Sequence, residues 1–159
     1  AMNLTQKLAF FVATAGGIGF VPKAPGTAGT LLAIPLVYWT GFWPIEARLA
    51  LWFTLLVIGP WAIAVTTKIN GSPDHSSIVI DEVLGYAVAT LFYPTSWPYL
   101  ILGFFLFRFF DIVKPGLIRT VDRLSKQSSG TWGAFIVILD DLLAGLCSWI
   151  FLEVGYQLT

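Results

Sequence analysis

The stretch IVIDEVLGYAVATLF (Ile78–Phe92) is apolar except for two adjacent carboxylates, Asp81 and Glu82, near its start. A later stretch, IVILDDLLAGLCSWIF (Ile136–Phe151), repeats this arrangement with a pair of aspartates. A charge at the centre of a bilayer helix costs roughly 2.5–3.5 kcal/mol on insertion scales, and such residues are functional candidates by default. Acidic pairs inside the most apolar segments therefore point to a site within a membrane bundle.

The composition supports a membrane protein. Of the 159 residues, 57% are hydrophobic and 11% are charged, whereas soluble domains carry roughly 25% charged residues. The mean hydropathy is +0.79. A net charge near zero gives no indication of nucleic-acid binding, and a single cysteine, Cys147, excludes an intrachain disulfide. We expect one integral-membrane domain over residues 2–159, with the opening Ala1 an expression remnant.

The apolar segments predict an all-α, polytopic membrane helix bundle with about five transmembrane helices. A helical span needs about 20 mainly apolar residues. The predicted spans are Leu31–Trp43, Leu49–Thr67, Ile78–Pro94, Trp97–Val113 and Thr131–Leu152. The weakly hydrophobic segment Leu4–Val21 is expected to form an interfacial or re-entrant helix. Pro60 is expected to be tolerated within its span.

Loop charges give this bundle an orientation. The loops that would share one face carry the basic residues Lys23, Lys68, Lys114, Arg119, Arg123 and Lys126. By the positive-inside rule this face is cytoplasmic, and the C-terminus lies on the other side.

The carboxylates within the apolar segments are Asp81, Glu82, Asp111, Asp140 and Asp141. Arg108, Asp111 and Lys114 follow at intervals of three, so they neighbour one another on one helix face; four acids remain without an obvious partner. Mg²⁺ prefers carboxylate oxygens and is commonly completed by substrate phosphates. Gly85 and Gly145, each four residues after an acid, would let helices approach closely. The alternative is that the acids pair with Arg and Lys as structural contacts.

Two loops on the same face offer further chemistry. PKAPGTAGT (Pro22–Thr30) is a glycine-rich turn that opens a helix, and such a turn can bind an anion through backbone N–H groups, with Lys23 close by. Taken alone, however, Pro and Gly between two apolar runs usually indicate only a turn. His75, the single histidine, could orient water or carry a proton, or be a solvated loop residue.

Several phosphatase chemistries are excluded. A phosphohistidine mechanism of the lipid-phosphatase type requires two histidines, no D-x-D-x-T motif occurs, and Cys147 lacks the basic loop of a cysteine phosphatase. Metal-activated water acting directly on phosphorus remains.

Four blocks of this sequence resemble the phosphatidylglycerophosphatase A family. They are PGTAGT from Pro25, DHSSIVIDEVLG from Asp74, FRFFDIVKPGLIRTVDR from Phe107, and DDLLAG from Asp140. The resemblance implies a Mg²⁺-dependent phosphatase at the bacterial inner membrane that converts phosphatidylglycerophosphate to phosphatidylglycerol. It places the family's acidic positions on Asp81, Glu82, Asp111, Asp140 and Asp141, and its basic positions on Arg108, Lys114 and Arg123.

The sequence-based hypothesis assigns a role to each of these residues. The expected catalytic residues are Asp81, Glu82, Asp111, Lys114, Asp140 and Asp141, the five acids among them holding one or two Mg²⁺ ions. The expected phosphate-binding residues are Lys23, Gly26, Thr27, Thr30, His75, Arg108 and Arg123. Water would attack phosphorus in line at the cytoplasmic face. The alternatives are a cation transporter or channel subunit and a lipid phosphotransferase that needs an alcohol acceptor.

Overall fold

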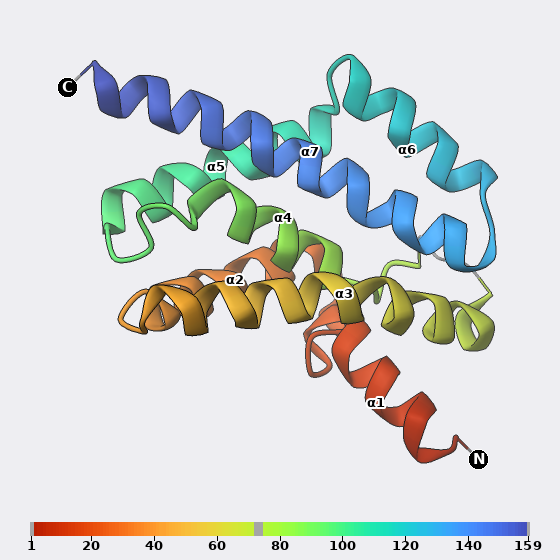
Figure 1. Ribbon diagram of the computed structural model, residues 1–159. Helices are drawn as coiled ribbons and strands as arrows, with labels where there is room; N and C mark the ends of the chain where they lie inside the picture. Colours follow the sequence, from red (N-terminus) through yellow and green to blue (C-terminus); the bar gives the residue numbers. More distant parts are fainter. Residues whose placement is uncertain (1, 72–74, 159) are drawn as a thin grey trace.

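The computed structural model describes residues 2–71 and 75–158 (Figure 1). Every regular element in these ranges is helical, which confirms the all-α prediction. The elements are α1 (Leu4–Ala13), the 3-10 helix η1 (Ile18–Phe20), α2 (Pro25–Thr40), α3 (Ile45–Asn70), α4 (Ile80–Thr90), α5 (Trp97–Val113), α6 (Leu117–Gln127) and α7 (Gly130–Gln157). The expectation that Ala1 is an expression remnant falls outside the described residues.

Helix α4 lies between α3 and α7 (Figure 1). It meets α7 where two glycines face each other. A methyl group on Gly145 would lie 2.1 Å from the Gly85 carbonyl oxygen, and one on Gly85 would lie 2.6 Å from the Asp141 carbonyl oxygen. These contacts confirm that small residues bring the two acid-bearing helices together.

Among the described residues, two helices are long and apolar enough to cross a membrane, α3 with 26 residues and α7 with 28. They contain the predicted spans Leu49–Thr67 and Thr131–Leu152, and α3 continues through Pro60 as expected. The other predicted spans correspond to α2, α4 and α5, with 16, 11 and 17 residues. At 1.5 Å per residue, α4 is about 17 Å long, against a hydrocarbon core of roughly 30 Å. The structure thus supports two of the five predicted spans by length.

Helix α6 lies in a segment that the sequence interpretation treated only as a cytoplasmic loop. Its buried residues, Ile118, Val121 and Ser125, recur every three or four positions and face α7, as on an amphipathic helix. The remaining positions are mostly charged or polar, so the segment was read as a loop.

The N-terminal segment packs against the loop that precedes α4. Helix α1 ends at Ala13, whose carbonyl oxygen accepts a hydrogen bond from the Val79 N–H at 2.9 Å. After the following turn, a methyl group on Gly19 would lie 1.9 Å from the Ser77 carbonyl oxygen. The predicted single helix over Leu4–Val21 is therefore a short helix, a turn and η1.

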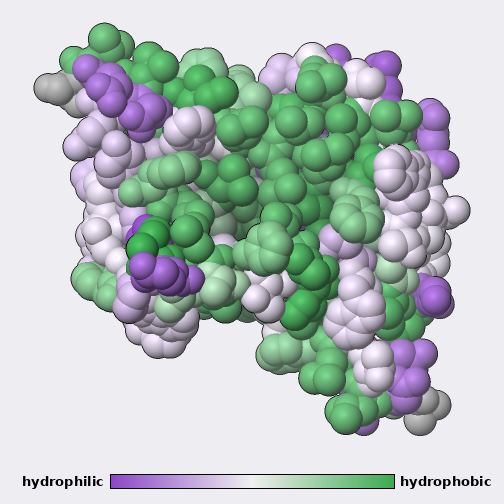
Figure 2. Space-filling model, viewed as in Figure 1, coloured by the Kyte–Doolittle hydropathy of each residue, from purple (hydrophilic) through white to green (hydrophobic). Residues whose placement is uncertain are grey.

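The outer surface is apolar over much of its extent. Figure 2 shows hydrophobic residues across the middle of one face, with hydrophilic residues gathered mainly toward its edges. Large apolar side chains that are more than half exposed include Phe53, Phe105 and Trp132. Exposed apolar patches of this extent mark a surface that contacts lipid or another protein.

Candidate active site

The first turn of α4 places an acidic pair beside α7. Helix α4 begins at Ile80, so Asp81 and Glu82 lie at its N-terminus, where the helix dipole favours negative charge. One carboxylate oxygen from each of Asp81, Glu82 and Asp141 lies within 4.8 Å of the other two. Asp81 is 9% exposed and Asp141 is 4% exposed. We call Asp81, Glu82 and Asp141 the acid trio.

Each member of the acid trio has an oxygen that no group in the described residues satisfies. Asp81 Oδ1, Glu82 Oε2 and Asp141 Oδ2 are buried and accept no hydrogen bond. Buried polar atoms normally have partners, and adjacent carboxylates disfavour one another's ionised form. Carboxylate oxygens are the ligands that Mg²⁺ prefers. This donor set therefore fits a hard divalent cation.

Asp140 and Asp141 contact different groups, because the side chains of successive helical residues point about 100° apart. Asp140 Oδ2 forms an ion pair with Lys114 Nζ, which lies just after the end of α5. Lys114 Nζ also lies 3.7 Å from Asp111 Oδ1. The expectation that Asp140 lacks a protein partner was therefore wrong.

Lys114 is held in its charged form by these acids. Burial by itself lowers the pKa of Lys114, but the nearby Asp140, Asp141 and Asp122 carboxylates outweigh burial and raise that pKa well above its ordinary value. An ammonium that keeps its charge at any physiological pH is suited to holding a phosphate oxygen.

Asp122 joins this site although the sequence reasoning did not select it. Its Oδ1 lies 3.0 Å from Lys114 Nζ and its Oδ2 lies 2.8 Å from Lys126 Nζ. Partial burial favours the neutral acid, but the hydrogen bonds from Lys126 and Lys114 prevail and lower the pKa of Asp122. Asp122 follows the buried Val121 on α6, so recognising this helix would have placed its carboxylate near the bundle.

Arg108 pairs with Asp111 on α5, as their spacing predicted. The bond is made by Arg108 Nη1 and Asp111 Oδ2, and the Arg108 Nε is buried without a partner in the described residues. One edge of the guanidinium therefore remains able to donate to a further acceptor.

The glycine-rich turn reaches the same place from α2. A methyl group on Gly26 would lie 2.2 Å from Glu82 Oε1 and 3.4 Å from Arg108 Nη1. Helix α2 begins at Pro25 without a side-chain cap, which leaves its first N–H groups, including those of Gly26 and the half-buried Thr27, without partners inside the helix. Thr30 is buried and donates its hydroxyl to the Gly26 carbonyl at 2.9 Å, so it supports the turn.

Three predicted phosphate-binding residues are not brought into this cluster by any described contact. Lys23 and Arg123 are exposed, and their side chains form no hydrogen bond or ion pair within residues 2–71 and 75–158. His75 is also exposed, and its Nδ1 lies 2.9 Å from Ser77 Oγ in a local loop interaction. Asp74, the first residue of one of the resemblance blocks, lies outside the described residues.

Comparisons with known proteins identify the family of this chain. The family model for phosphatidylglycerophosphatase A matches residues 11–155. Phosphatidylglycerophosphatase A of Escherichia coli (strain K12) is 35% identical over 133 residues, covering 83% of this chain and 74% of that protein. The enzyme of the same name from Haemophilus influenzae is 36% identical over 137 residues, covering 82% and 77%.

A third relative carries a different name. A Bacteroides thetaiotaomicron protein, described as a candidate phosphatidylinositol-3-phosphatase, is 34% identical and covers 97% of both chains. No solved structure matches. The family match covers the glycine-rich turn, the acid trio, Lys114 and Asp122 together, and the chain belongs to the phosphatidylglycerophosphatase A family.

Proposed function

We propose that this protein is a Mg²⁺-dependent lipid phosphatase that hydrolyses the terminal phosphomonoester of phosphatidylglycerophosphate to phosphatidylglycerol. Membership of the family and the names of two relatives support the substrate. The acid trio supports a metal because three of its buried oxygens accept no hydrogen bond in the described residues.

The position of Glu82 is the observation that best supports the proposal. Its carboxylate belongs to the acid trio and also lies against the Gly26 turn, where a phosphate could accept N–H bonds. A carboxylate and a phosphate placed side by side repel unless a cation lies between them. One site that holds an anion-binding turn and an all-carboxylate donor set therefore suits a phosphate with its metal ion.

The proposed roles follow from these contacts. Asp81, Glu82 and Asp141 hold the ion. Asp140 and Asp111 are the other two acids expected from the sequence to bind metal. When bound, Mg²⁺ supplies charge neutralisation and a more acidic water. Arg108 and the first N–H groups of α2 orient the phosphate, and Lys114 adds a positive charge from the end of α5.

We also propose that the protein is embedded in the bacterial inner membrane with this site facing the cytoplasm. Only 39% of the most apolar window of α3 and 50% of that of α7 are buried within the protein, which suits helices that also contact lipid. No described observation supports the transporter alternative.

The test is phosphate release from phosphatidylglycerophosphate in detergent, with and without Mg²⁺. Wild type should release phosphate only with the metal, Asp81→Asn should be inactive, and Glu153→Gln, a half-buried acid near the end of α7, should behave as wild type. Full activity in chelator would reject the metal. Release from phosphatidylinositol 3-phosphate in preference to phosphatidylglycerophosphate would transfer the assignment to the substrate named for the third relative.

A further inference from the structure

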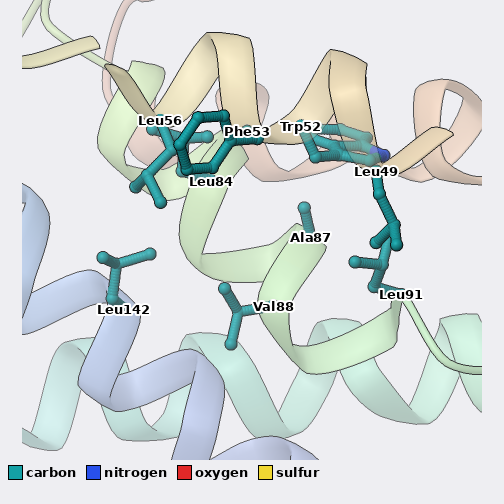
Figure 3. A pocket seen from close by; sticks show the side chains of 9 residues that line it. All are labelled: Leu49, Trp52, Phe53, Leu56, Leu84, Ala87, Val88, Leu91 and Leu142. Atoms are coloured by element: carbon teal, nitrogen blue, oxygen red, sulfur yellow. The ribbon is translucent and has the colours of Figure 1, made fainter. Parts of the chain in front are cut away.

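An apolar groove with a volume of about 290 Å³ lies between α3 and α4. Figure 3 shows the nine side chains that line it, which come from α3, α4, α7 and Leu91, the residue directly after α4. The indole nitrogen of Trp52 is the only polar atom that these side chains carry. We call this feature the α3–α4 groove.

The groove is elongated along the two helices. In Figure 3, Leu84, Leu56 and Leu142 lie toward one end, and Leu49 and Leu91 lie toward the other. From Leu84 to Leu91 is seven residues, which corresponds to about 10 Å along the helix. This is roughly two thirds of one leaflet, taken as half of a 30 Å hydrocarbon core.

One end of the groove adjoins the acid trio. Leu142 directly follows Asp141 on α7, and Leu84 comes three residues after Asp81 on α4, a spacing that makes the two side chains neighbours on the helix surface. The close approach at Gly85, where an added methyl would meet the Asp141 carbonyl oxygen at 2.6 Å, fixes these two helices against each other. The groove therefore starts within a helical turn of the proposed phosphate site and runs away from it.

We propose that the α3–α4 groove binds one acyl chain of the phospholipid whose phosphate is cleaved at the acid trio, an inference that rests on the proposed function. The acyl chain would lie along α4, from Leu84 to Leu91 just after the end of the helix. A headgroup would find no charged group and a single N–H there, whereas a hydrocarbon chain requires none.

The groove acts by positioning the lipid. Bilayer lipid is as apolar as the groove, so an acyl chain gains little free energy from the transfer itself. A chain held beside α4 instead fixes the depth and direction of the attached headgroup, which is the kind of orientation that raises the rate of reaction. This increase in reaction rate should appear with diacyl substrates and be absent with a substrate that has the same headgroup but no acyl chains.

The experiment compares kcat/KM for phosphatidylglycerophosphate and for its deacylated, water-soluble form. Leu56 lies at the acid-trio end of the groove and is 36% exposed, so a larger side chain can be accommodated there. Leu56→Trp should lower kcat/KM for the diacyl substrate about tenfold, equivalent to about 1.4 kcal/mol, and leave the deacylated substrate unchanged. Thr54→Trp, at an exposed position of α3 outside the groove, is the matched control.

A second measurement depends neither on catalytic activity nor on whether the Leu56→Trp variant folds. Phosphatidylglycerol with a diazirine on one acyl chain should label α3 and α4 residues of the groove in wild-type protein, and less so in Leu49→Trp, which narrows the far end. Labelling spread evenly over exposed apolar positions such as Ile101 of α5 would overturn the proposal. An equal decrease in kcat/KM for both substrates in Leu56→Trp would also overturn it.

The outcomes separate this inference from the proposed function. If wild type cleaves neither substrate, the proposed function fails, and the labelling pattern still decides whether a chain occupies the groove. If Leu56→Trp changes the oligomeric state while no lipid label reaches the groove, its occupant is a second copy of this chain and the proposal is wrong.

Discussion

Gly145 passes so close to Gly85 that the space for a single methyl group is missing between them. An added carbon on Gly145 would lie 2.1 Å from the Gly85 carbonyl oxygen. Because Asp141 precedes Gly145 by one helical turn and Asp81 precedes Gly85 by one turn, this crossing sets how near the two acidic segments can come.

Gly145→Ala should therefore separate α4 from α7 and weaken the fold. Overpacking of this kind typically costs about 1–3 kcal/mol, and the added carbon meets backbone, which cannot rotate away. Thermal unfolding in detergent should show a lower midpoint together with reduced phosphate release. Gly155→Ala on the same helix, where an added methyl meets nothing within 4 Å, should leave both unchanged; equal effects of the two changes would refute this account.

Gly26→Ala should reduce activity with little loss of stability. The added methyl would lie 2.2 Å from Glu82 Oε1, and because that oxygen ends a flexible side chain, Glu82 can move aside at small cost. The displaced carboxylate would no longer meet the acid trio, so phosphate release should fall at least about tenfold, equivalent to about 1.4 kcal/mol. An unfolding midpoint close to wild type distinguishes this result from misfolding, and unaltered kcat/KM would contradict it.

Asp141→Asn and Asp140→Asn should change stability in opposite directions when divalent ions are absent. Asp141 contributes one of three mutually repelling carboxylates, so its neutralisation should raise the unfolding temperature; 1 kcal/mol corresponds to about 2–4 °C for a chain of this size. Asp140 is paired with Lys114, so its neutralisation should lower that temperature.

Added Mg²⁺ extends the same comparison. An ion that binds only the folded protein raises the unfolding temperature, so wild type should gain stability from Mg²⁺ and Asp141→Asn should gain much less. Identical Mg²⁺ responses of wild type and Asp141→Asn would remove the acid trio as the metal site.

The ion pairs of Asp122 should weaken in acid. The pKa of Asp122 is lowered below its ordinary value of 3.8 by Lys126 and Lys114. A lowered folded-state pKa contributes stability that is present above the unfolded-state pKa and is lost as pH falls through the folded-state value. The difference in unfolding temperature between wild type and Asp122→Asn should thus shrink from about pH 5 to about pH 2. A constant difference would show that charge at Asp122 contributes nothing.

The sequence was informative wherever a local pattern determines structure. Apolar runs predicted α2, α3, α4, α5 and α7, the interval of three predicted the Arg108–Asp111 pair, and the small residues predicted the α4–α7 approach. Helix α6 was missed because its sequence is mostly polar. Helix length was less predictable, because apolar composition continues past Thr90, where α4 ends.

The partners of individual acids could not be read from the sequence. Whether Asp140 meets Lys114 or a metal depends on the rotation of α7 about its axis, which long-range packing decides. The contact between Asp122 and Lys114 depends on where α6 folds back against α7. Neither relationship has a signature in the order of the residues.

The hydrogen bond from the Val79 N–H to the Ala13 carbonyl makes the beginning of the chain part of the scaffold for α4. Val79 lies two residues before Asp81, although Ala13 is far from it in sequence. Removing the N-terminal residues up to and including Ala13 would leave the Val79 N–H, directly before α4, without its acceptor. Tags and fusions are therefore better tolerated before α1 than as a replacement for it.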